Sequence, residues 1–536
     1  MKKLKLVCVA IAMACATPTL AGGLLTNTNQ HVAFDRMMSR EASIGIDGVY
    51  YNPAGVVFMS EGHHLAINWQ LAFQSRTINN DYALFTNNVN NPITPRDFKG
   101  TAFAPVIPSF QYAYNKGKWS FQASFALTGG GGKCTFDDGL GSFEKIVAET
   151  AIAACGLAGV VDQTLGNTIG QPGMEMFTSD QAFGKTGKYS FNSYMHGRQY
   201  YYGLSVGAAY KFCDNFSAFL GVRGVYALTN YYGYVENINV GNMPLYKVLD
   251  PTKESSANIE LSCDQSGVGF TPIIGVDYKT GRWNFSAKYE FKTRIRLKNK
   301  SVNQTPSIGN LPANLANQMT GILTAKYQQA GLPLEQAKQQ AENTTNTVLA
   351  DPTVGATMVG LKTQFDQKLN KAIGEYEDGK KIAGDIPAYL ALGVGYSPVD
   401  AVRVNAGFHW FDDKNATSYN NRNKELKRGT LEYNAGVEVD VNKKITLSTG
   451  WQNTNYGLSD EYMDDKSFVV SSNSVAIGGV YHINKKMDLN VAYFHTFYQH
   501  KKTTETVQLT ADISRNYSSD YTRNNNVFAV GLDINF

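Results

Sequence analysis

From residue 63 onward, hydrophobic and polar positions alternate with a period of two. The alternation recurs in the segments 119–128, 283–292 and 402–410. It is clearest at the end of the chain, where one face carries Phe528, Val530, Leu532, Ile534 and Phe536. Successive side chains of a β-strand point to opposite faces of its sheet. The pattern therefore predicts many strands, each with one apolar and one polar face.

Counting these segments predicts about fourteen antiparallel strands, an even number as in bacterial outer-membrane barrels. The predicted strands are 63–78, 104–115, 118–128, 199–212, 215–232, 257–279, 282–297, 386–397, 401–412, 428–440, 444–456, 468–483, 487–499 and 523–536.

The connections between the predicted strands alternate in length. Turns such as 280–281 and 441–443 are short, whereas 129–198 and 298–385 are long and polar. Aromatic residues crowd the strand ends, as at Tyr200–Tyr202. These features are typical of a membrane β-barrel, which must close because lipid cannot pair backbone groups. We expect an all-β, multi-pass antiparallel barrel in the outer membrane of a Gram-negative-type cell, and not a soluble sandwich.

Two of the long connections contain helical patterns. Residues 140–165 carry apolar side chains at helical spacing. In the connection 298–385, the segment 311–345 predicts two short helices separated by Gly331, and a third is expected within 351–376. These helices either cap the barrel by packing on each other or form an apolar landing groove on the cell surface.

Composition agrees with glycine-punctuated aromatic strands, with 50 Gly, 31 Tyr and 28 Phe in 536 residues. The net charge of +4 is nearly balanced and predicts no nucleic-acid partner. Residues 1–21 have the charged start, short apolar core and small residues of a secretory signal peptide. The remaining chain divides into a segment of residues 22–62 and a barrel of residues 63–536.

The segment of residues 22–62 precedes the first predicted strand and is too apolar for a disordered tail. A barrel of about fourteen strands has a lumen that its own side chains cannot fill. We therefore expect this segment to fold inside the barrel as a plug. Its centre is a turn signal formed by Asn52, Pro53, Ala54 and Gly55.

The sequence resembles the FadL-type outer-membrane transporters of long-chain fatty acids and aromatic hydrocarbons. The resemblance lies in Asn52-Pro53-Ala54 within SIGIDGVYYNPAGVVFM, in ALTGGGG (126–132), in the segments 271–298 and 385–410, and in the final VGLDINF. It implies that an apolar ligand lands among the outer loops and moves an N-terminal hatch. The ligand then leaves sideways through a gap beside a kinked third strand.

The resemblance makes the glycines at the end of the third strand candidates for the lateral opening. They are Gly129, Gly130, Gly131 and Gly132. Glycine weakens strand pairing and tolerates bulges. We expect the ladder to break there and open the wall, with a flexible loop start as the alternative. On this interpretation, valine at Gly129 and Gly130 would favour pairing and close the gap.

Inward-facing cations are candidates for binding a fatty-acid carboxylate. They are Arg223, Lys288 and Arg403. Alternatively, they balance the inward acids Glu290, Glu432 and Glu438. An aromatic hydrocarbon would need no cation, so the sequence leaves the ligand open.

Cys134 and Cys155 flank the helical pattern in one long loop and are candidates for an extracellular disulfide. Cys263 is a competing partner, and Cys213 lies in a turn on the opposite side.

No nucleophile elbow or recognisable triad is present, so we expect no enzyme, and no cofactor or metal is called for. The expected partners are a hydrophobic small molecule and the lipid and lipopolysaccharide of the outer membrane, and the expected state is a monomer. The alternative function is that of a general diffusion porin for polar solutes, which would need an open polar lumen.

Overall fold

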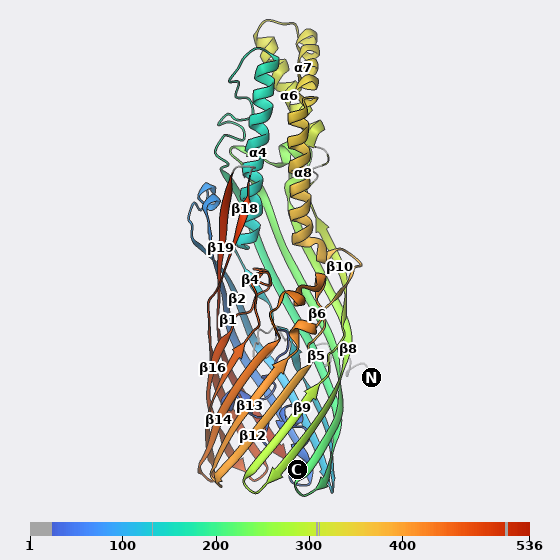
Figure 1. The fold of residues 1–536 in the computed structure, drawn as a ribbon, viewed down its shortest axis with the longest axis vertical. Coiled ribbons are helices and arrows are strands. Elements are labelled where there is room, and N and C mark those ends of the chain that lie inside the picture. The colour runs from blue at the N-terminus through green and yellow to red at the C-terminus, as the bar shows by residue number, and fades with distance from the viewer. Residues whose placement is uncertain (1–23, 131, 307–308, 310, 510–512) are drawn as a thin grey trace.

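The computed structural model describes residues 24–130, 132–306, 309, 311–509 and 513–536. The predicted signal peptide, the first two residues of the predicted plug and Gly131 lie outside the described residues. Within them the chain forms one tall, closed β-barrel with a tower of helices at one end (Figure 1).

Fourteen antiparallel strands make up the described barrel, as the period of two predicts. Closure comes from β1, which pairs with β2 on one edge and with β19 on the other. The barrel strands are β1 (Gly62–Tyr82), β2 (Arg96–Lys116), β3 (Trp119–Gly129) continued by β4 (Cys134–Phe136), β5 (Tyr189–Cys213), β6 (Phe216–Val240), β8 (Ile259–Thr280), β9 (Trp283–Glu290) continued by β10 (Arg296–Gln304), β12 (Tyr389–Val399), β13 (Val402–Phe411), β14 (Thr430–Asn442), β15 (Ile445–Asn455), β16 (Ser472–Asn484), β17 (Met487–Tyr498) and β19 (Ser514–Asn535).

The wall is taller on one side than the alternation predicts. β5 begins at Tyr189 and β6 runs to Val240, both beyond the predicted ends. The predicted strand 282–297 is not continuous, because β9 ends at Glu290 and β10 begins at Arg296. Shorter strands, β7 (Met243–Pro244), β11 (Lys381–Ala383) and β18 (Lys501–Gln508), pair along the extended side.

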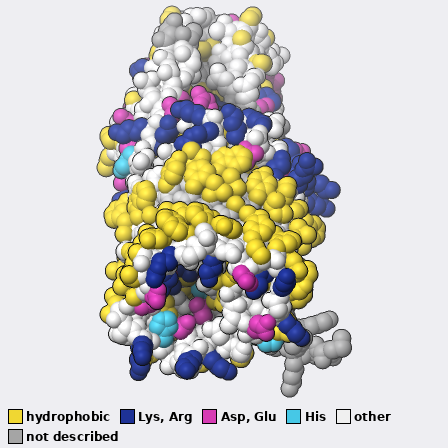
Figure 2. All heavy atoms as spheres, turned by 60° about the horizontal axis from the view of Figure 1, so that its bottom comes forward, with side chains coloured by type: hydrophobic (Ala, Val, Ile, Leu, Met, Phe, Trp, Pro, Cys, Tyr) yellow, Lys and Arg dark blue, Asp and Glu magenta, His cyan; other side chains and the backbone are white. Residues whose placement is uncertain are grey.

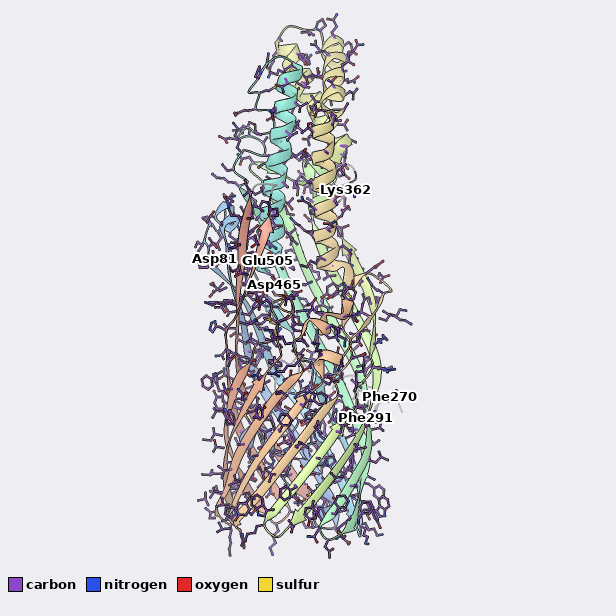
Figure 3. The ribbon with its side chains drawn as sticks, in the orientation of Figure 1. Asp81, Phe270, Phe291, Lys362, Asp465 and Glu505 are labelled. Atoms are coloured by element: carbon purple, nitrogen blue, oxygen red, sulfur yellow. The ribbon has the colours of Figure 1, made fainter. Side chains whose placement is uncertain are left out.

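The outer face of the barrel carries a band of hydrophobic side chains bordered by Lys and Arg (Figure 2). Leu220 and Phe270 are 69% and 70% exposed, and Phe270 and Phe291 lie on the outside of the wall (Figure 3). Such a band is what a barrel presents to lipid. The C-terminus lies at the end of the barrel opposite the helices (Figure 1).

The helical tower is built from α4 (Gly141–Thr168), α6 (Leu311–Gln329), α7 (Leu334–Leu349) and α8 (Pro352–Ile373). Gly331 links α6 to α7 at φ +97°, a conformation that glycine adopts without strain. Asp351 caps α8 by accepting bonds from the amides of Thr353 and Val354. By length and composition α4 is apolar enough to cross a membrane, yet it stands above the barrel against α7 and α8 (Figure 1).

Short helices complete the described elements. Three of them, α2 (Val32–Met37), α3 (Gly48–Tyr51) and η1 (Gly55–Phe58), precede the first strand. The others lie in the loops and are η2 (Ala83–Asn87), α5 (Tyr246–Leu249), η3 (Glu254–Ala257), η5 (Gly374–Tyr376), η6 (Asp413–Asn415) and η7 (Tyr419–Glu425).

Candidate functional site

An apolar cavity lies between the helices of the tower, and we call it the outer groove. It encloses about 60 Å³. One stripe of α4 lines it at helical spacing, and residues of α5, α6 and α8 line much of the rest, together with loop residues such as Phe177 and Phe183 and the strand residues Ile238 and Ile259. Representative lining residues are Val147, Ala154, Leu157, Val161, Val248, Leu315, Leu361 and Phe365. A cavity with such a lining stays dry and favours an apolar occupant.

Polar contacts on other faces of α4 hold this helix in place. Glu149 accepts a bond from the Tyr82 hydroxyl at 3.2 Å and faces the Lys368 ammonium at 2.5 Å. Glu144 accepts a bond from the Tyr189 hydroxyl at 2.9 Å. These buried acids tie α4 to the barrel rim and to α8. The groove is therefore held open by contacts outside its own lining.

The foot of α4 is capped by a loop from the far side of the barrel. Asp465 accepts bonds from the Ser142 amide at 2.8 Å and from its hydroxyl at 2.9 Å, and it lies beneath α4 in Figure 3. Burial, and then the charge of Asp464, raise the pKa of Asp465 above its ordinary value. Since the first turn of a helix favours acceptors, this contact fixes where the groove begins.

Below the outer groove a second apolar cavity of about 50 Å³ leads toward the barrel. It shares Ile146, Val147 and Ile259 with the outer groove and reaches Met195 on β5. Met195 belongs to an apolar group that we call the entrance cluster, formed by Ile78, Ala102, Cys134, Phe136, Leu140, Met195, Phe468, Val470 and Tyr521. Apolar surface therefore continues from the tower into the mouth of the barrel.

Residues 24–61, which we call the lumenal segment, lie inside the barrel. Its helix α2 packs against β14–β17, β19 and β1, while α3 and η1 pack against β2, β3, β5 and β8. Ion pairs fix it to one side of the wall. Arg40 binds Glu438 at 3.1 Å, and Glu41 lies 2.7 Å from His409, which also contacts Glu432 at 2.8 Å.

The turn signal at Asn52 to Gly55 is bonded to three strands. The Asn52 amide donates to Asp277 of β8 at 2.6 Å. The carbonyls of Pro53 and Ala54 accept bonds from Gln122 of β3 and Ser217 of β6, each at 2.7 Å. A local turn motif thus serves as the anchor of the lumenal segment to the wall.

Gly55→Ala is expected to loosen this anchor. A Cβ at this position would lie 2.4 Å from the Asn52 amide nitrogen, which must then leave Asp277. Losing a bond to a buried carboxylate costs about 1.5–3 kcal/mol. We expect faster proteolysis of residues 24–61 and higher ion conductance in planar bilayers. Gly156→Ala, where a Cβ meets open space, is the control. A variant as closed and protease-resistant as the parent would contradict the anchor.

Residues of α2 and α3 form an apolar group with the barrel wall, which we call the central cluster. It contains Phe34, Met38, Tyr50, Tyr51, Ala72, Ala104, Ile107, Leu127, Tyr200, Ala476, Phe494 and Val527. Ala102 of the entrance cluster and Ala104 of the central cluster are successive inward residues of β2. The two clusters therefore adjoin along that strand.

The wall beside the central cluster is not fully paired. β3 pairs with β2 only from Phe110–Phe125 to Lys116–Trp119, and β4 pairs with β2 again at Gly100–Phe136 and Thr101–Thr135. Residues 102–109 of β2 have no partner on β3 or β4 among the described residues. We call this interruption the wall gap. The other edge of β3 stays paired with β5 as far as Gly129.

The end of β3 bonds instead to the start of the lumenal segment. The Gly130 amide donates to the Leu25 carbonyl at 2.8 Å, and the Asn27 amide donates to the Thr128 carbonyl at 3.0 Å. β3 loses its pairing with β2 after Phe125, and its last residues, up to Gly130, bond to the lumenal segment instead. Any movement of that segment acts directly on the strand that borders the gap.

The glycines are sterically required, so the expectation for valine is wrong. A Cβ at Gly129 would lie 2.8 Å from the Leu25 carbonyl oxygen, and one at Gly130 would lie 2.7 Å from the Gln199 carbonyl oxygen. Gly130 also has φ +85°. Valine would clash with backbone here and could not simply restore pairing. Gly132 lies in the unpaired stretch before β4.

Proline residues of β2 lie on the other side of the gap, and their role was not predicted from the sequence. Pro105 and Pro108 lie within the unpaired stretch 102–109. Proline lacks a backbone donor and is confined to strand edges and bulges. A register shift between Gln70 and Ala72 of β1 places such a bulge at this point. Two prolines three residues apart in an otherwise alternating strand were the feature of the sequence from which the gap could have been predicted.

The candidate cations have partners within the protein. Arg223 makes two bonds to Glu290, at 2.6 and 3.0 Å, and the Lys288 ammonium lies 3.0 Å from the same acid. Arg403 binds Asp440 at 2.6 Å and Glu438 at 3.4 Å. These contacts correspond to the charge-balancing alternative.

The disulfide expected between Cys134 and Cys155 is not formed, and all four described cysteines are free. Cys134 lies in the wall on β4, whereas Cys155 lies fourteen residues beyond the first residue of α4. At 1.5 Å per residue that is about 21 Å along the helix. The two thiols are kept apart by the length of α4. The disulfide was predicted from positions along the sequence, without an estimate of the distance that the helix places between the two cysteines.

No family model and no curated protein matches the sequence. Among solved structures, a FadL homologue from Pseudomonas aeruginosa matches 96% of this chain and 100% of its own, with a TM-score of 0.59 at 14% identity. The chain has the FadL-type barrel fold. The resemblance found in the sequence is thus confirmed at the level of fold. A FadL-type barrel with the lipid-facing band of Figure 2 belongs in the Gram-negative outer membrane.

Two further structures share this FadL-type architecture more distantly. A mutant of TodX, described as a monoaromatic hydrocarbon channel, covers 94% of this chain and 99% of its own at 12% identity and a TM-score of 0.50. The toluene transporter TodX of Pseudomonas putida covers 96% and 100% at 13% identity, with a TM-score of 0.49.

Proposed function

We propose that this protein takes up hydrophobic small molecules across the outer membrane, with long-chain fatty acids as the favoured class. The main observation that supports this proposal is the wall gap. In lipid, an unpaired backbone group is costly, and barrels close to avoid it. An unpaired stretch that contains two prolines and adjoins an apolar cluster is therefore best explained as an exit.

The proposed route follows the apolar surfaces in order. A ligand enters the outer groove, passes the entrance cluster, reaches the central cluster and leaves through the wall gap into the membrane. Each buried CH₂ contributes about 0.8 kcal/mol toward capture. Movement of the lumenal segment would open the route, because residues 25–27 hold the end of β3.

Aromatic hydrocarbons are the second candidate class. The TodX mutant of similar fold is described as a monoaromatic hydrocarbon channel, and Thr150 is the one polar side chain among the described residues that line the outer groove. A general porin is disfavoured, because the lumenal segment packs against the inner wall nearly all the way round. The protein would work as a monomer, since one chain closes the barrel, with lipid and lipopolysaccharide against its outer band.

The test is uptake by the full chain reconstituted in vesicles. Labelled long-chain fatty acid, toluene and a hydrophilic sugar are supplied separately, and mass spectrometry identifies any molecule that co-purifies. We expect fatty acid to be taken up and sugar excluded. Uptake of toluene alone would favour the second class, and sugar uptake would overturn the proposal in favour of a porin.

A further inference from the structure

Two arginines face each other across the seam that closes the barrel. Arg76 of β1 and Arg523 of β19 are direct partners in the ladder. Both belong to the inward-facing series of their strands, and Arg523 is only 6% exposed. Like charges placed directly opposite each other repel. The pair is therefore unfavourable unless something between them is negative.

Neither guanidinium has a carboxylate partner among the described residues. Arg523 donates to the side-chain oxygen of Gln74 at 2.7 Å, and Arg76 donates to the same oxygen at 3.3 Å. One neutral amide oxygen thus serves two cations. Arg223, by contrast, has two bonds to Glu290. The charge at the seam is uncompensated.

Several buried donors around the pair lack an acceptor within the described chain. They are Nε of Arg523, Nε2 of Gln74, Nδ2 of Asn525 and the hydroxyl of Tyr498, and one acceptor, Oδ1 of Asn525, is unpaired beside them. Asn525 is the ladder partner of Gln74, and the Arg523 guanidinium lies 5.2 Å from the Tyr498 ring centre. Buried donors are normally satisfied. Unsatisfied donors gathered about two cations point to a missing anion.

Apolar residues lie on both sides of the pair along the same two strands. Toward one end, Ala72 and Val527 belong to the central cluster. Toward the other end, Ile78 and Tyr521 belong to the entrance cluster. An anion bound at the arginines would therefore have apolar surface directly next to it.

We propose that Arg76 and Arg523 bind the carboxylate of an apolar chain, with Gln74, Asn525 and Tyr498 donating to the same oxygens. The chain of the ligand lies along the central cluster toward the wall gap. This inference rests on the proposed function and specifies its substrate class. Guanidinium groups suit it because they bind a planar carboxylate through two parallel bonds.

The test compares the parent protein with Arg76→Gln/Arg523→Gln, using a long-chain fatty acid and the alcohol of the same chain length. We expect affinity for the acid to fall at least about tenfold while affinity for the alcohol stays unchanged. Arg76→Lys/Arg523→Lys should retain most of the preference for the acid. Thermal stability of the glutamine variant should hold or rise, because a repulsion is removed.

Three results would contradict the proposed site, and a fourth would contradict the proposed function. Equal losses for acid and alcohol would show that the arginines only shape the lumen, and an unchanged affinity for the acid would refute their role. Inorganic phosphate that binds the pair without being displaced by the fatty acid would identify a site for small anions only. If the parent binds neither the acid nor the alcohol, the proposed function itself fails.

Discussion

Replacing Ala104 with tryptophan is expected to lower uptake of hydrophobic ligand at least tenfold while the barrel still forms. Ala104 is fully buried, lies in the unpaired stretch of β2 at the wall gap and belongs to the central cluster. An indole ring there would occupy the space between that cluster and the unpaired part of β2. Overpacking costs about 1–3 kcal/mol, which a closed barrel should withstand. The measurement is ligand uptake in vesicles, with folding followed by heat-modifiable migration on gels.

The neighbouring residue supplies the control. Phe103 lies on the same strand but is 51% exposed toward lipid, where it stacks on Phe73. Phe103→Trp adds a similar ring on the outer side and should leave uptake unchanged. Normal uptake by a correctly folded Ala104→Trp variant would place the exit elsewhere.

Placing two carboxylates in the outer groove is expected to abolish capture at low ligand concentration. Ala154 and Leu157 line the groove on the apolar stripe of α4. In Ala154→Asp/Leu157→Asp, the ligand would lose burial of about four CH₂ groups, or about 3 kcal/mol at 0.8 kcal/mol each. That corresponds to about a hundredfold weaker binding. This loss of affinity is measured by the binding of a fluorescent fatty acid to the purified protein.

A charge on the exposed side of the same helix provides the comparison. Gly156 is exposed, and a Cβ there meets open space. Gly156→Asp adds an acid without touching the groove and should bind ligand as the parent does. Circular dichroism checks that α4 survives in both variants. Unchanged binding by the double variant would mean that the groove only packs the tower together.

The strands and their lipid face follow from the sequence because their cause is local. A period of two decides which side chains face outward, and the sequence contains that period wherever a strand crosses the membrane. The turn at Asn52–Gly55 is equally local, since Pro and Gly fix its backbone. The outer extensions, such as β5 from Tyr189, and the break between β9 and β10 were not predicted. In the extensions the wall no longer faces lipid, so no apolar outer face is required there and the alternation is lost.

Contacts between distant residues were decided only by the tertiary structure. Asn52 meets Asp277, Arg223 meets Glu290, and the end of β3 meets Leu25, because closure and register bring them together. Arg76 and Arg523 illustrate this most clearly, since they lie near opposite ends of the chain and become neighbours only when the first strand pairs with the last. Local alternation determines which face each side chain takes, whereas the closed ladder determines which charges share the lumen.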